Sequence, residues 1–127
     1  MIARLRRHAA LTIALMAVAT GAMAGVVDIV WDASGQFERA LTVAPGKFAE
    51  VCGKLAKGQA VSWSFASLQP MNFNVHYHEG EQVVFPAKHD GIARSEGKLE
   101  VSADQDYCWM WTNKSDAPVS LRLMLKR

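Results

Sequence analysis

The residues most able to do chemistry in this sequence lie close together. His76 and His78 are two positions apart, acidic side chains follow at Glu79 and Glu81, and His89 comes a few residues later. Imidazole and carboxylate groups bind ions such as copper(II) and zinc, and imidazoles also exchange protons near neutral pH. No other part of the sequence gathers so many groups of this kind. We therefore predict a copper or zinc site drawn from these five residues.

The residues before Glu79 alternate as in a β-strand with one apolar face. The apolar members are Phe73, Val75 and Tyr77, and the polar members between and after them are Asn74, His76 and His78. Side chains two apart on a strand point to the same side. Both imidazoles are thus predicted to face water and to reach one ion. Residues 83–85 are predicted to form a second strand that ends at Pro86.

An alternative is that this polar face is a plain solvated surface or contacts a partner protein. Asn74 lies on the same face and would belong to such a surface. Trp109 and Trp111 are predicted core residues, but they would form an aromatic platform for a partner if they shared that face.

The first 24 residues have the features of a secretory signal peptide. They contain a positive segment with Arg4, Arg6 and Arg7, an apolar run at residues 9–19, and an A-x-A cleavage signal at residues 22–24. We predict cleavage before Gly25 and export to the periplasm or the medium. No cysteine follows the cut, so no lipid anchor is predicted. No later stretch approaches the run of about 18 apolar residues that a transmembrane helix needs.

The net positive charge of the whole sequence comes from the basic residues of this leader. The whole sequence has 14 basic and 12 acidic residues, and without residues 1–24 the basic count falls to 11. A nearly neutral domain lacks the clustered Lys and Arg that bind nucleic acid or anionic membranes. We predict neither as a partner, and we predict one domain over residues 25–127.

The sequence has two cysteines, Cys52 and Cys108. An even pair in a small exported domain is expected to form a disulfide bond. Reduced thiols that bind copper would be the alternative, but the C-x-x-C spacing that would support them is absent. We predict a Cys52–Cys108 disulfide.

Short segments of alternating apolar and polar residues recur along the chain between Gly, Pro, Asn and Asp turns. Residues 106–112 are apolar on both parities, which is typical of a central strand. Turns are predicted at residues 66–70 and 88–91, and no apolar helical stripe of ten or more residues occurs after Gly25. We predict an all-β fold, an antiparallel β-sandwich or jelly roll of seven to nine short strands.

Several residues follow an order that is typical of one family of β-sandwiches: Cys52, Val61-x-Trp63-x-Phe65, Phe73-x-Val75, Gly97, and Tyr107 to Asn113 followed by Ser115. In this order the sequence resembles the GOLD domain, the lumenal domain of the p24 (emp24) cargo proteins, over residues 48–125. The family's late cysteine would fall at Met110, two residues after Cys108. The resemblance implies a β-sandwich that binds a partner, and it does not imply vesicle traffic.

A weaker resemblance concerns the metal motif of cupins, which His76-x-His78 and Glu81 share in part. It implies a metal-dependent enzyme, although the spacing to Glu81 is shorter than in that family. No Gly-x-Ser-x-Gly motif occurs, and a disulfide would remove both thiols as nucleophiles. We therefore predict a binding protein and not an enzyme. The hypotheses, in order, are an exported protein that binds copper or zinc, a metal-independent module that recognises an envelope protein, and a cupin-like metal enzyme.

Overall fold

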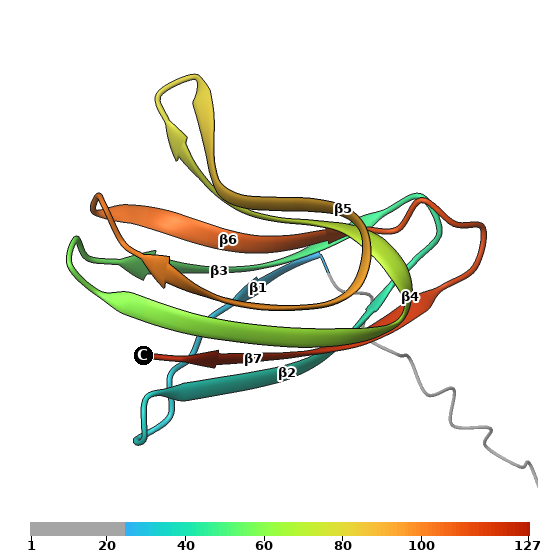
Figure 1. The fold of residues 1–127 in the computed structure, drawn as a ribbon, viewed down its shortest axis with the longest axis horizontal. Helices are drawn as coiled ribbons and strands as arrows, with labels where there is room; N and C mark the ends of the chain where they lie inside the picture. The colour runs from blue at the N-terminus through green and yellow to red at the C-terminus, as the bar shows by residue number, and fades with distance from the viewer. Residues whose placement is uncertain (1–24) are drawn as a thin grey trace, which may run out of the picture.

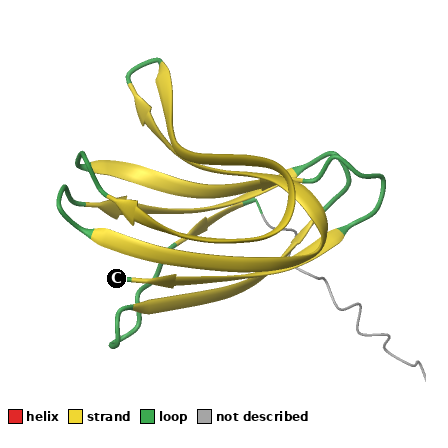
Figure 2. Cartoon of the chain, viewed as in Figure 1, coloured by secondary structure: helices red, strands yellow, loops and turns green. Residues whose placement is uncertain are grey.

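The computed structural model describes residues 25–127, and these residues form seven β-strands without a helix (Figure 2). The predicted signal peptide lies outside the described residues. In the described part of the chain no helix could cross a membrane. The strands are β1 (Val26–Asp28), β2 (Gln36–Val43), β3 (Phe48–Leu55), β4 (Ala60–Glu79), β5 (Gln82–Glu100), β6 (Gln105–Thr112) and β7 (Val119–Lys126).

The strands form one sheet that curls into two layers because β4 belongs to both (Figure 1). Residues 62–67 of β4 pair with β7, whereas residues 72–76 pair with β6. The order along the sheet is β1-β3-β6-β4-β7-β2, and β5 pairs with β4 along most of its length. All pairs are antiparallel except β1 with β3. The predicted all-β sandwich is confirmed.

The core lies between the two layers and is filled by the apolar parity of each strand. β7 shows the rule most plainly, since buried and exposed residues alternate along its whole length. At the centre, the ring of Phe73 lies 4.7 Å from that of Phe65 and 5.6 Å from that of Trp111, measured between centroids. Trp109 and Trp111 have no exposed surface. They are core residues, so the alternative that they form an exposed partner surface is wrong.

Two predicted turns are instead parts of continuous strands. Residues 66–70 lie within β4 and residues 88–91 within β5. Pro70 is accommodated because β4 changes neighbour here, from β7 to β6, and residues 68–71 have no ladder partner on that side. Pro86 does not end β5, because it lies at a register shift on a strand that pairs only with β4. Edge strands and bulges are the places where a sheet tolerates proline.

The predicted disulfide between Cys52 and Cys108 is present. The two cysteines are directly opposite each other in the β3–β6 ladder. Some residues of the GOLD-like motif have structural roles. The buried amide of Asn113 donates to the carbonyl groups of Val43 and Ala117, and so closes the loop between β6 and β7.

Candidate functional site

His76 lies on the outer face of the layer that contains β3, β6 and the second half of β4. Its ladder partner on β6 is Cys108, which is bonded to Cys52 on β3. The core-facing residues on either side of it are buried as predicted, namely Phe73, Val75 and Tyr77. The predicted parity of the strand is therefore confirmed.

The predicted contact of both imidazoles with water is wrong for one of them. His78 is exposed, but only 5% of the surface of His76 is accessible. The cause is a register shift between β4 and β5, which places two residues of β5 opposite His76. One of them is Phe85, whose ring centroid lies 6.0 Å from that of His76. Phe85 of β5 thus lies by a histidine that local alternation assigns to the surface.

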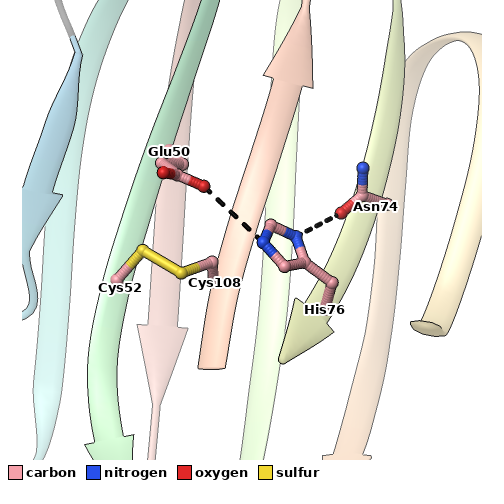
Figure 3. The surroundings of a disulfide bond; sticks show 5 residues. All are labelled: Glu50, Cys52, Asn74, His76 and Cys108. Atoms are coloured by element: carbon pink, nitrogen blue, oxygen red, sulfur yellow. Dashed lines mark hydrogen bonds and ion pairs between the residues drawn. A yellow bond between two sulfur atoms is a disulfide. The ribbon is translucent and has the colours of Figure 1, made fainter. Parts of the chain in front are cut away.

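Both ring nitrogens of His76 have a polar neighbour (Figure 3). Nδ1 lies 2.7 Å from Oδ1 of Asn74, which precedes it by two residues on the same face. Nε2 lies 3.7 Å from Oε2 of Glu50 on β3, a separation longer than a hydrogen bond. With the Asn74 oxygen as acceptor, the proton of a neutral imidazole lies on Nδ1. The lone pair of Nε2 then faces the Glu50 carboxyl group.

The two facing groups are both shifted toward their neutral forms. Burial raises the pKa of Glu50, and the charge of His78 opposes that rise. Burial also lowers the pKa of His76, and the charge of His78 lowers it further. The contact between Glu50 and His76 is therefore not a strong ion pair, although the two side chains face each other. His78 acts on both groups, which places it beside the pair.

A hollow of about 360 Å³ lies over these side chains. Its polar lining comes from β3 and β4 and consists of Glu50, Asn74, His76 and His78. Its apolar lining comes from β3, the hairpin tip and β6 and consists of Phe48, Val83, Phe85 and Met110. Figure 1 shows that this tip turns away from the rest of the sandwich.

The structure brings together only part of the predicted metal site. The ring centroids of His76 and His78 are 5.4 Å apart. Among the described residues, Glu50, His76 and Cys108 offer ligand atoms that all lie within 4.8 Å of one another. Since Cys108 is oxidised in the disulfide, its sulfur is not a thiolate, and the nitrogen and the carboxylate oxygen are the ligand atoms that fit a metal ion.

The other predicted ligands are not part of this group. Glu79 and Glu81 lie at the exposed tip of the hairpin. His89 is exposed and is opposite Phe73, a residue whose parity is that of the core and not that of His76. Hence the structure offers Glu50 in the position that these three residues were predicted to fill.

Sequence reasoning missed Glu50 and the apolar residues around the hollow. One signal for Glu50 was available: it precedes Cys52 by two residues, so both side chains lie on one face of β3. That signal becomes useful only when the strand order is known. β6 lies between β3 and β4, and this order is set by contacts far apart in the sequence.

No protein-family model matches this sequence, and no curated protein matches it closely enough to count as a relative. The resemblance to GOLD domains is tested by none of the comparisons and stays a prediction.

Several solved structures share the fold. A periplasmic inhibitor of g-type lysozyme, PliG from Aeromonas hydrophila, is similar with a TM-score of 0.62 and 14% identity, over 82% of this chain and 96% of that one. PliG from Salmonella Typhimurium is similar with a TM-score of 0.55 and 9% identity, over 82% and 98%. The pre-peptidase C-terminal domain of a collagenase from Bacillus anthracis is similar with a TM-score of 0.57 and 10% identity, over 81% and 96%. At these identities the likeness concerns the fold alone.

Proposed function

We propose that this chain is an exported binding protein that holds a partner protein at the hollow over Glu50 and His76, and that it binds without catalysing a reaction. The observation that carries the proposal is the rim of the hollow. Phe48, Val83 and Phe85 are 45%, 42% and 45% exposed, and all three line this one hollow. Single exposed apolar residues are common on protein surfaces, whereas grouped ones mark interaction sites.

The composition of the hollow fits a protein partner. Aromatic side chains supply large contact areas, and the partly buried polar groups below them would select a partner that can hydrogen-bond to them. Lys88 places its ammonium group 5.2 Å from the centroid of the Phe85 ring and adds a charge at the rim. These features are typical of the centre and rim of a recognition surface.

The fold and the leader support the same proposal. Two proteins with this fold are periplasmic and inhibit g-type lysozyme. The predicted signal peptide at residues 1–24 would bring this chain to the same kind of compartment. A g-type lysozyme is therefore the first partner to test.

The test measures binding of the purified protein to a g-type lysozyme by biolayer interferometry, and lysis of peptidoglycan in its presence. We expect Phe48→Ser and Phe85→Ser to lower affinity at least ten-fold each. Leu68→Ser is the matched control, because Leu68 is 80% exposed and lies outside the lining of the hollow.

If lysozyme does not bind, a photo-crosslinking side chain placed at position 85 or 68 tests other envelope proteins in intact cells. A partner that crosslinks from 85 and not from 68, and is lost in Phe48→Ser, supports the proposal. Equal crosslinking from both positions, or none from either, overturns it.

A second candidate function is binding of a copper or zinc ion at His76 and His78. It is favoured by the position of His76, which is held by Asn74 at one nitrogen and faces a carboxyl group with the other.

A further inference from the structure

Two acceptor atoms face each other beside the hollow when the Glu50 carboxyl group is ionised. Asn74 holds the tautomer of His76 in which Nε2 carries a lone pair, and the Glu50 carboxyl oxygen lies 3.7 Å away. The side chains are 7% and 17% exposed, so water screens this contact poorly. Such an arrangement is stabilised when a cation binds between the two atoms.

The separation of the two atoms suits a metal ion. Zinc binds imidazole nitrogen and carboxylate oxygen at about 2.0–2.2 Å, which places two ligand atoms of a tetrahedral ion about 3.4 Å apart. A movement of a few tenths of an ångström would close the observed 3.7 Å to that distance. Neither side chain needs a new rotamer to meet this condition.

His78 can supply a third ligand once its ring turns, since its nitrogens are outside the group of ligand atoms that lie within 4.8 Å of one another. Two imidazoles on one tetrahedral ion have ring centroids about 5 Å apart, given the same bond lengths, and the rings of His76 and His78 are 5.4 Å apart. Because His78 is exposed, its ring can turn toward the ion without displacing core residues. Its charge already acts on both Glu50 and His76, as their pKa shifts indicate.

We propose that Glu50, His76 and His78 bind one divalent ion of the zinc or copper(II) class, and that Asn74 is the positioning residue for His76. This rests on the second function proposed above and replaces the expected ligands Glu79, Glu81 and His89. Two imidazoles and one carboxylate match the preference of both ions. Three protein ligands leave one position of a tetrahedral ion for water or for a side chain of a partner.

The fold fixes these ligands on two strands of one layer, Glu50 on β3 and both histidines on β4, with β6 between them. Glu50 is opposite Met110 in the β3–β6 ladder, and His76 is opposite Cys108 in the β6–β4 ladder. The disulfide joins β3 to β6 directly beside His76. Strands therefore hold Glu50 and His76, and the main movement that binding requires is a turn of the exposed His78 ring.

The experiment is isothermal titration calorimetry of the purified protein with zinc chloride and, separately, copper(II) chloride, with metal content measured after dialysis. We expect one ion per chain and at least a ten-fold loss of affinity in Glu50→Gln, His76→Ala and His78→Ala. The matched controls are Glu96→Gln, which removes a carboxylate of the other layer, and His89→Ala, which removes a histidine outside the group. Both should bind as the parent does.

The possible results distinguish the proposed metal function from the proposed set of ligands. If no ion binds to the parent protein, both the metal function and the ligand set are wrong. If His76→Ala loses the ion but Glu50→Gln binds as the parent does, the metal function stands and the ligand set is wrong. If His76→Ala fails to fold by near-ultraviolet circular dichroism, the exposed His78→Ala and the isosteric Glu50→Gln still decide the outcome.

Discussion

Asn74 is the residue whose role is most specific to the proposed ligand set. Its Oδ1 lies 2.7 Å from Nδ1 of His76 and leaves Nε2 free. Partners of this kind contribute about 10- to 100-fold to metal affinity by fixing the tautomer and the ring orientation of a ligand. We expect Asn74→Leu to lower zinc affinity by that factor, and Asn74→Asp, which keeps the acceptor, to restore it. Equal affinity in both variants would show that Asn74 only fills space.

The buried carboxyl group of Glu50 makes stability depend on pH. Burial raises its pKa above the ordinary value of 4.5, so the folded chain holds this proton more tightly than the unfolded chain does. Between these two pKa values the folded state binds more protons, and the free energy of unfolding falls as the pH rises. The variant Glu50→Gln has no ionisable group at this position, so its free energy of unfolding does not fall with pH for this reason.

In the presence of a chelator, we therefore expect Glu50→Gln to gain stability relative to the parent as the pH rises through the ordinary value of 4.5 and above it. Urea denaturation at several pH values measures the difference, and Glu96→Gln is the control on the other layer. A constant difference across the range would mean that Glu50 ionises as freely in the folded chain as in the unfolded chain.

His76 makes stability depend on pH in the opposite direction to Glu50. Its pKa is lowered by burial and by His78 from the ordinary value of 6.5. The unfolded chain therefore binds the proton more readily, and the stability that neutral His76 provides is lost as the pH falls below about 6.5 and through the lower folded pKa. In His76→Phe, we expect urea denaturation to show a smaller loss of stability than the parent shows on acidification through this window. A loss as large as that of the parent would place its origin in another group.

Sequence reasoning at this scale was correct about side-chain parity and wrong about burial. Alternation put His76 on the outer face, and the structure agrees. Alternation cannot tell whether another segment covers that face. Phe85 does so through a register shift in the hairpin, and such a shift has no counterpart in the local pattern of polar and apolar residues.

At the scale of elements, the β4–β5 hairpin links the two layers, and one glycine allows its strands to pack. Gly97 on β5 is opposite Trp63 on β4, and the indole ring lies where a Cβ atom of residue 97 would be. The ring belongs to the core, so it has little room to move.

We expect Gly97→Ala to lower the free energy of unfolding by about 1–3 kcal/mol, the usual cost of overpacking a core. Gly25→Ala is the matched control, since a Cβ atom there meets nothing within 4 Å. Urea denaturation followed by tryptophan fluorescence measures both. Equal stability of the two variants would mean that the indole can shift without cost.

Prolines 70 and 86 show the limit of sequence reasoning for elements. Each is a signal for a turn or a strand end, and each does mark an irregularity in the hairpin. Pairing nevertheless resumes beyond both positions, because β4 and β5 face each other again after the bend. Each proline therefore indicated correctly that the strand pairing is irregular there, but neither one ends its strand.

For the whole molecule, the fold class followed from short alternating segments between turns, and the disulfide followed from an even cysteine pair in a chain predicted to be exported, whereas the strand order followed from neither. Nothing in the sequence indicates that β4 changes neighbour from β7 to β6, or that β6 separates β3 from β4. Both facts depend on contacts between distant segments. The position of Glu50 beside His76 depends on that order, and for this reason it could not be predicted.

The disulfide provides a test of how the whole molecule holds the site. It closes a loop between positions 56 residues apart, and a link of this length stabilises a fold by about 3–4 kcal/mol, mainly by restricting the unfolded chain. We expect the double variant Cys52→Ser/Cys108→Ser to lose about that much stability to urea, compared with the parent under oxidising conditions.

The same variant should still bind zinc with the affinity of the parent under conditions in which it is folded. The β3–β6 ladder holds residues 48–55 against residues 105–112, and the β6–β4 ladder holds His76 opposite Cys108, so the two ladders together place Glu50 beside His76 without help from the bond. A folded variant that has lost zinc binding would show instead that the disulfide, and not the two ladders, sets the distance between the two ligands.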